Sequence, residues 1–289
     1  MYRTIRAIHD SFRDDIGDLV TRRPLPGPRV SQVDPFLFLN HHGPQTYAPN
    51  NRGLPFGPHP HRGFETVTFI LEGELGHYDS GGHESVIRAG GVQWMTAGAG
   101  LIHAELSPPS FKREGGPMEI LQLWVNLPSR LKMTAPAYTG VQREDIPALP
   151  TGDGGATLNL IAGELGAAKG PVETLSSHFM STMELTPGAR AVLRAPATRN
   201  VFFYVVRGAV RVSGQDVPHW RLVEFNDDGD EIVVEAANEP AFILFGHGEP
   251  INEPVVAHGP FVMNTREEII AAIQDYQAGN FGEPPKVSV

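Results

Sequence analysis

The pattern that most constrains the fold of this chain is a strand, a glycine-bearing turn and a second strand, which occurs twice. In the first copy Phe64–Leu71 leads through Gly73, and in the second Val201–Val206 leads through Gly208. Gly208 lies 135 positions after Gly73 (208 − 73), about half of the 289 residues. Solenoid repeats recur every 20 to 50 residues or so, and the much longer spacing therefore predicts a duplicated β-domain.

Further short strands are predicted on both sides of this pattern. They are bounded by Gly, Pro, Asp or Asn and cover residues 85–88, 92–96, 118–126, 157–163, 178–185, 190–194, 222–225, 231–235 and 241–246. The 32 glycines and 26 prolines fit frequent turns. Many short strands favour a sandwich or barrel. Residues 131–150 resemble a junction, and we expect domains at 1–133 and 134–289.

One helix is well indicated near the end of the chain. Thr265 and Glu268 form a capping box and Gly279 follows the end, which predicts a helix at about 266–278. Its apolar stripe comprises Ile269, Ile270, Ile273 and Tyr276. A second, weaker helix is expected at 169–175.

Charge and composition limit the function. The formal net charge of −10 disfavours direct nucleic-acid binding and attachment to an anionic membrane. Cysteine is absent, so any metal must be bound by nitrogen and oxygen atoms. The first ten residues contain no apolar signal segment, and no run of about 18 apolar residues occurs. We therefore expect a soluble, cytoplasmic protein without a membrane span.

Two pairs of metal-binding residue types stand out. His59 and His61, and likewise His103 and Glu105, are two positions apart in strand-like sequence, which places each pair on one strand face. If the two strands face each other across a barrel, three imidazoles and one carboxylate reach a single ion. A lone His-x-His is just as often an exposed or structural pair. The second pair, which follows a glycine-rich turn, favours the metal site.

The remaining histidines lack such spacing. His41 and His42 are adjacent and point to opposite strand faces. We expect surface or structural roles for these two and for His77, His83, His178, His219, His247 and His258.

A site with three imidazoles and one carboxylate suits Fe, Mn, Co, Ni, Cu or Zn. The order of affinities of these metals for such ligands does not identify which one is bound. Octahedral coordination would leave two positions for a chelating substrate, or for a substrate and dioxygen. Non-haem iron oxygenases use this arrangement.

Longer stretches resemble a known family. The spacing from Gly53 through His59, His61 and Glu65 to Gly73 resembles the first cupin motif, and residues 91–103 resemble the second. The runs 59–68, 90–105 and 259–265 are similar to those of the pirin family of bicupins. This resemblance implies an all-β fold of two cupin-type antiparallel β-barrels or jelly rolls, with a C-terminal α-helix.

The resemblance also implies a metal centre. It assigns Fe(II) to His59, His61, His103 and Glu105, and it places Glu65 beside the site or as a strand partner. Aligning Gly208 with Gly73 puts Arg194 and Pro196 opposite the first two histidines, so the C-terminal cupin is expected to have lost its metal site.

The function implied by the resemblance is oxidation of a small aromatic chelator. We expect a dioxygenase that opens a flavonol ring of the quercetin type, with Glu105 as ligand and as the base for the 3-hydroxyl proton. Residues that can wall the pocket are Phe56, Phe64, Trp94 and Met95, although core packing explains each equally well. Another enolisable chelator is also a possible substrate. The alternative of a different class is a metal- and redox-dependent regulator that binds a transcription factor or a metabolic enzyme.

Overall fold

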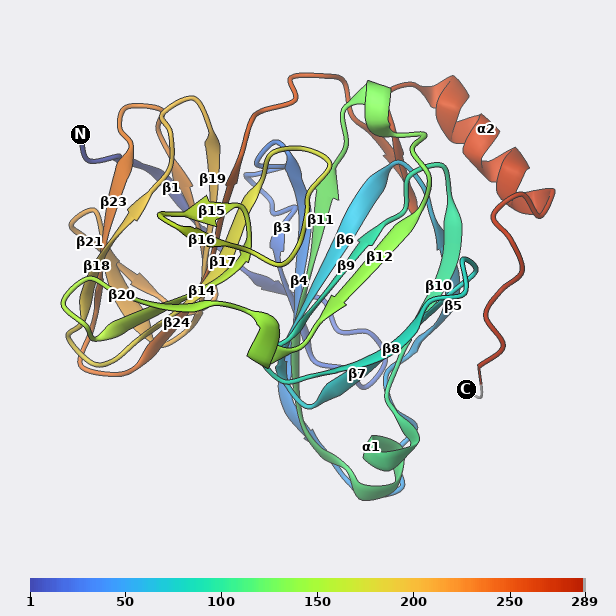
Figure 1. Ribbon diagram of the computed structural model, residues 1–289, viewed down its shortest axis with the longest axis horizontal. Coiled ribbons are helices and arrows are strands. Elements are labelled where there is room, and N and C mark those ends of the chain that lie inside the picture. Colours follow the sequence, from blue (N-terminus) through green and yellow to red (C-terminus); the bar gives the residue numbers. More distant parts are fainter. Residues whose placement is uncertain (288–289) are drawn as a thin grey trace. The chain divides into compact units, whose positions relative to one another are not determined.

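The computed structural model describes residues 1–287 and forms two compact units, each built mainly from antiparallel β-sheets (Figure 1). The N-terminal sandwich comprises residues 13–22, 38–143 and the chain from 251 onward. The C-terminal sandwich comprises residues 1–12, 23–37 and 144–250. The all-β bicupin expected from the sequence is therefore confirmed.

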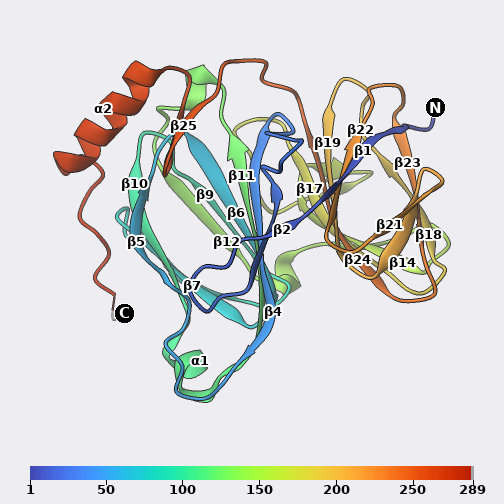
Figure 2. The same ribbon diagram turned by 180° about the vertical axis from the view of Figure 1, so that it is seen from behind.

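The ends of the chain are exchanged between the units. Residues 1–12 belong to the C-terminal sandwich, where strand β1 (Ile5–Asp10) pairs with strand β22 (Arg221–Phe225), as Figure 2 shows. The chain from 251 onward belongs to the N-terminal sandwich. The contiguous domain bounds 1–133 and 134–289 stay a prediction.

The N-terminal sandwich has one large and one small sheet. The strand order is β12-β9-β6-β11-β4-β3-β2 in the large sheet and β5-β10-β7-β8 in the small one. The elements are β2 (Phe12–Arg13), β3 (Thr21–Leu25), β4 (Phe36–Tyr47), β5 (Phe56–His61), β6 (Phe64–Glu72), β7 (Glu74–Asp79), β8 (Glu84–Arg88), β9 (Val92–Thr96), β10 (Leu101–Leu106), α1 (Pro109–Glu114), β11 (Gly116–Asn126), β12 (Ala137–Val141), β25 (Val256–His258), β26 (Phe261–Met263) and α2 (Arg266–Gln277).

The C-terminal sandwich repeats this plan. Its sheets have the orders β1-β22-β19-β24-β17-β14-β13 and β18-β23-β20-β21, and a small hairpin, β15-β16, is added. The remaining strands are β13 (Ala148–Thr151), β14 (Ala156–Ala162), β15 (Glu164–Leu165), β16 (Ala168–Lys169), β17 (Phe179–Leu185), β18 (Arg190–Arg194), β19 (Asn200–Arg207), β20 (Ala209–Val212), β21 (Gln215–Pro218), β23 (Glu231–Ala236) and β24 (Ala241–Gly248).

The duplication predicted from the two glycine turns is visible strand by strand. The order β9-β6-β11-β4 corresponds to β22-β19-β24-β17, and β5-β10-β7-β8 corresponds to β18-β23-β20-β21. Gly73 and Gly208 occupy equivalent turns with φ of 83° and 72°. A Cβ at Gly73 would lie 2.8 Å from the Pro117 carbonyl oxygen, and one at Gly208 would lie 2.3 Å from that of Pro240. Both turns therefore require glycine for conformation and for space.

Helix α2 begins and ends close to the predicted positions. The Thr265 hydroxyl accepts a hydrogen bond from the Glu268 backbone N–H, and the Glu268 carboxylate accepts one from the Thr265 backbone N–H. Ile269 and Ala272 are buried against a cluster that includes Phe261. Ile270 is 54% exposed, so the apolar stripe is narrower than expected. No helix among the described residues is long and apolar enough to span a membrane.

The helix expected at 169–175 was wrong. The backbone N–H of Val172 donates to the carbonyl of Ile161, and Gly170 lies so close that a Cβ there would be 2.5 Å from the same oxygen. This long-range pairing holds the segment extended, and a single turn of helix has too few internal hydrogen bonds to compete with it.

The capping box provides a test of the α2 assignment. Thr265→Ala removes one reciprocal hydrogen bond and should lower the free energy of unfolding by about 1 kcal/mol. Urea unfolding measures this change, with Gln274→Ala at an exposed position of the same helix as the control. Equal effects of the two substitutions would contradict the capping role.

Candidate metal centre

The two histidine-bearing strands lie next to each other. β5 is an edge strand and pairs with β10 in antiparallel register, with His59 opposite His103 and Pro60 opposite Ile102. Proline cannot donate a ladder hydrogen bond and is tolerated at this edge. The expectation that the strands face each other across a barrel was wrong, because they are neighbours in one sheet. Side chains directly opposite on paired strands share a face, so the register itself brings the imidazoles together.

Three imidazoles converge in the N-terminal sandwich. One ring nitrogen from each of His59, His61 and His103 lies within 4.8 Å of the others. The ring centroids are 4.4 Å apart for His59 and His103, 4.8 Å for His59 and His61, and 5.0 Å for His61 and His103. This spacing allows all three to bind one ion.

Hydrogen bonds orient two of the rings. Nδ1 of His59 lies 2.7 Å from the carbonyl oxygen of Gly57, and Nδ1 of His61 lies 3.2 Å from that of Pro260. Because a carbonyl only accepts, each Nδ1 carries the hydrogen and each Nε2 presents a lone pair. Backbone carbonyls commonly orient metal-binding histidines in this way.

His103 has no hydrogen-bond partner on either ring nitrogen, although it is only 1% exposed. A buried polar atom without a partner is costly, and a metal ion would satisfy it. Burial, with the nearby His59, lowers the pKa of His61 to about 3, and burial lowers the pKa of His103 well below 6.5. Both rings are therefore neutral near pH 7, which is the form that binds metals.

Glu105 lies outside the group of converging nitrogens. It is buried, and its carboxylate accepts hydrogen bonds from the Thr68 hydroxyl (2.8 Å) and the Gln122 side-chain amide (2.5 Å). Both donors belong to the opposing sheet, on β6 and β11. Of the four predicted ligands, the structure thus brings three together, while the role of Glu105 stays a prediction.

Glu65 is held elsewhere. Its carboxylate accepts a hydrogen bond from the hydroxyl of Thr96, its cross-strand partner on β9. Burial raises the pKa of Glu65, and the Thr96 hydrogen bond opposes this rise. The expected position as a strand partner agrees with this pairing.

The structure adds a buried polar group that sequence spacing did not reveal. His77 on β7 is 1% exposed, and its ring centroid lies 5.5 Å from that of His103. Its Nε2 lies 2.9 Å from an Asp79 carboxylate oxygen, and its ring stacks on Tyr138 at 3.8 Å. His77 and Asp79 have the two-residue spacing of one strand face, and His83 follows four residues after Asp79, so a signal was present in the sequence.

Aromatic rings adjoin the histidines. Phe64 and Trp124 lie 5.1 and 5.4 Å from the His61 ring, centroid to centroid. Trp124 was not among the predicted pocket residues. Of those residues, Phe56 lies against His42, Met95 shares a face with Thr66, and Trp94 shares the opposite face with Val67. Phe64 and Trp124 thus border the histidine group, and a pocket role of Phe56, Trp94 and Met95 stays a prediction.

Two basic side chains, Arg62 and Lys132, hold the loops around the site in place. Arg62 Nε donates to the Ala99 carbonyl (2.6 Å), Nη1 pairs with Asp275 (2.8 Å), and the guanidinium lies 4.6 Å from the Phe281 ring centroid. Lys132 Nζ donates to the carbonyl of Gly63 at 2.8 Å and to two further oxygens. These bonds hold the turn that follows β5 and the turn that precedes β10. Burial lowers the pKa of Lys132 to about 8.

The equivalent strands of the C-terminal sandwich differ in sequence. β18 reads Arg-Ala-Val-Leu-Arg and β23 reads Glu-Ile-Val-Val-Glu-Ala, so neither contains histidine. The repeat keeps the strands and not the histidines.

Comparison with known proteins identifies the family. A model of pirin matches residues 18–125, and a model of the pirin C-terminal cupin domain matches residues 180–282. A pirin-like protein of Caulobacter vibrioides is 41% identical over 272 residues, which cover 93% of this chain and 94% of that protein. The chain belongs to the pirin family.

Two further similar proteins extend the comparison. Pirin of Homo sapiens is 38% identical over 267 residues, covering 90% of this chain and 87% of that protein. A crystal structure of an Acinetobacter baumannii protein described as quercetin 2,3-dioxygenase has a TM-score of 0.92 and 36% identity, covering 98% of this chain and 99% of that one. The family resemblance expected from the sequence is thus confirmed over nearly the whole chain.

Metal content tests the histidine site of this pirin-family chain. His103→Ala should lower the metal bound per chain by at least about tenfold, because removal of a ligand costs more than removal of an outer hydrogen-bond partner. Elemental analysis after dialysis measures the loss. His219→Ala, at an exposed position, should keep the full content. Undiminished metal in His103→Ala would contradict the site.

Acid sensitivity tests the burial of His61. The unfolded chain takes up a proton on this ring near pH 6.5, whereas the folded metal-free protein does so only near pH 3. Stability should therefore decrease as pH falls below 6.5, by up to about 1.4 kcal/mol per pH unit from this group.

Urea unfolding of metal-free protein between pH 8 and pH 4 or so measures the slope. His61→Gln should flatten the acidic part of the curve and leave the slope above pH 7 or so unchanged. Parallel curves over the whole range would show that His61 is not buried as a neutral ring.

Proposed function

We propose that this chain is an Fe(II)-dependent dioxygenase that opens the ring of a quercetin-type flavonol with release of carbon monoxide. The observation that carries the proposal is the convergence of His59, His61 and the unpartnered, buried His103. The name of the Acinetobacter baumannii relative supports the substrate class. Mn, Co, Ni, Cu and Zn suit the same nitrogen donors.

The residues present fit a divalent ion. Nε2 of His59 and of His61 would hold it, together with a ring nitrogen of His103, while Gly57 and Pro260 fix the first two rings. When bound, the metal supplies a Lewis acid that lowers the pKa of the flavonol 3-hydroxyl and a place where substrate and dioxygen meet.

Glu105 would accept the 3-hydroxyl proton. Its two carboxylate oxygens are held by Thr68 and Gln122, and each oxygen keeps a further lone pair for a proton or a metal ion. The hydrogen bonds orient the carboxylate without consuming its basic capacity. Glu105 thus serves as the proton acceptor, and as a fourth ligand when its side chain turns toward the histidines.

Aromatic side chains would bind the flavonol rings. Phe64 and Trp124 border His61, and Phe38 stacks on Trp124 at 4.7 Å between centroids. Such rings favour offset stacking with a planar substrate and keep water from the oxidised carbon atoms. On the His103 side of the histidine group, the His77 ring lies next to His103 and stacks on Tyr138, and His77 is paired with Asp79.

Turnover of quercetin tests the proposal. Protein reconstituted anaerobically with Fe(II) should consume quercetin and release carbon monoxide after dioxygen is admitted. Glu105→Gln should lower the rate at saturating quercetin by about 10² to 10⁴, which is the range for loss of a general base. Loss of quercetin absorbance and trapping of carbon monoxide measure the reaction.

Glu65→Gln is the matched control, because Glu65 is also buried but bonds to Thr96 outside the histidine group. It should leave the rate within about threefold of the unaltered protein. Equal losses in both variants would contradict a special role for Glu105. No turnover by protein with a full complement of iron would reject the dioxygenase and favour the regulatory alternative.

A further inference from the structure

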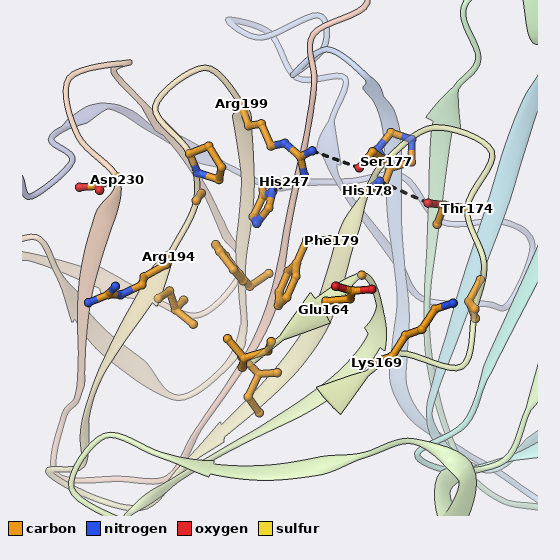
Figure 3. A pocket seen from close by; sticks show the side chains of 18 of the residues that line it. Glu164, Lys169, Thr174, Ser177, His178, Phe179, Arg194, Arg199, Asp230 and His247 are labelled. Carbon is orange, nitrogen blue, oxygen red and sulfur yellow. Dashed lines mark hydrogen bonds between the residues drawn. The ribbon is translucent and has the colours of Figure 1, made fainter. Parts of the chain in front are cut away.

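The C-terminal sandwich contains a cavity of about 1280 Å³, shown in Figure 3. This volume exceeds the 300 to 1,000 Å³ or so that is usual for small-molecule sites. The lining comes from β14, β17, β18 and β24, with the β15–β16 hairpin at one side. The cavity thus lies inside the repeat whose β18 and β23 strands carry no histidine.

One part of the cavity wall is apolar. Phe179 and Phe245 contact each other edge to face, with centroids 5.8 Å apart, and Leu158 and Leu193 lie in the same core cluster. A ring or a branched alkyl group would find apolar contact against these side chains.

Nitrogen groups gather at one end of the cavity. Arg199, His247 and His178 lie together above Phe179 in Figure 3. The His247 ring stacks on Phe179 at 4.9 Å between centroids. His178 is 3% exposed, and neither of its ring nitrogens has a hydrogen-bond partner. The fold itself leaves this buried ring unsatisfied, which points to a ligand or water that completes it.

Three hydrogen bonds fix the Arg199 side chain and leave some of its N–H donors unused. Its Nε donates to Glu249 (2.8 Å), Nη2 donates to the Ser177 hydroxyl (3.1 Å), and Nη1 lies 3.4 Å from Nδ1 of His247. A guanidinium has five N–H donors, so two remain. The Arg199 carbonyl accepts a hydrogen bond from the buried Arg3 side chain at 2.9 Å, which holds the backbone in place.

His247 completes a donor cluster. Because Arg199 cannot accept a hydrogen bond, Nδ1 of His247 is the acceptor in this contact and its hydrogen resides on Nε2. Burial, with the charge of Arg199, lowers the pKa of His247 to about 3, and burial lowers that of His178 to about 4, so both rings are neutral near pH 7. Arg199 is ion-paired with Glu249, and its two remaining N–H donors together with the Nε2–H of His247 suit a single carboxylate.

Most other charges along the lining have partners. Lys169 pairs with Glu173, Arg194 with Glu231, and Asp230 with the N-terminal amine, while Glu164 is exposed on the hairpin. Within residues 1–287, three metal-binding side chains converge only at His59, His61 and His103. An organic anion therefore fits this cavity better than a metal ion.

We propose that the cavity of the C-terminal sandwich binds an organic carboxylate with an apolar, ring-sized body. The carboxylate meets the remaining N–H groups of Arg199 and the Nε2–H of His247, and the body lies against the apolar wall that includes Phe179 and Phe245. Arg199 is suited to this task because its planar fork matches a carboxylate. The site is separate from the histidine triad and from the proposed dioxygenase.

Benzoate serves as the test ligand for the cavity. Benzyl alcohol, which has the same ring but no charge, serves as the comparison ligand. Isothermal titration of the full chain should show one benzoate bound per chain, and binding should persist in His103→Ala, where the metal site is disabled. Arg199→Gln should weaken benzoate binding by about tenfold or more through loss of the charged fork. Benzyl alcohol should bind at least about tenfold more weakly than benzoate.

Arg194→Gln is the matched control, since Arg194 lines the cavity but its side chain is 76% exposed and paired with Glu231. It should bind benzoate as the unaltered protein does. Unchanged affinity in Arg199→Gln, loss of binding in His103→Ala, or no saturation up to about 10 mM benzoate would overturn the proposal.

A crystallographic measurement needs no variant. Crystals of the unaltered protein soaked in 4-bromobenzoate should give an anomalous bromine peak inside the cavity, near Phe179 and Phe245. A bromine found only elsewhere would overturn the proposal even if Arg199→Gln did not fold.

Discussion

The antiparallel register between β5 and β10 is the constraint on which the metal centre depends. It sets His59 directly opposite His103, 44 residues later in the chain (103 − 59), and the two-residue strand period then adds His61 on the same face. A shift of one residue would turn one set of imidazoles to the other side of the sheet. The turns held by Arg62 and Lys132 flank these strands and stabilise that register.

The two sandwiches share one strand order but gather their buried histidines in different places. In the N-terminal sandwich the nitrogen groups come from β5 and β10 of the small sheet. In the C-terminal sandwich His247 comes from β24 of the large sheet and His178 from the residue before β17. The nitrogen-bearing side chains therefore lie on different strands in the two units while the strand order stays the same.

Much of the fold could be predicted because its signals are local. The predicted strand at 190–194 agrees with β18, and the strand predicted at 92–96 agrees with β9. The capping box of α2 and the left-handed conformations of Gly73 and Gly208 are also local features. Strand β4, Phe36–Tyr47, was missed because two histidines, a glycine and a proline interrupt its apolar alternation.

The relations that were not predicted depend on distant parts of the chain. Nothing near residues 169–175 indicates that Val172 pairs with Ile161, and nothing near β5 tells whether β10 is a neighbour or a facing strand. His77 was assigned a surface or structural role, and only the fold places it beside His103. Trp124 likewise reaches His61 through the pairing of β11 with β6.

The central claim is that His59, His61 and His103 together bind one ion. Anomalous diffraction from crystals of the iron-loaded protein, recorded on both sides of the iron absorption edge, tests it most directly. We predict one strong peak bonded to nitrogen atoms of all three histidines. A peak bonded to fewer than three of them, or iron located only elsewhere in the chain, would contradict the account.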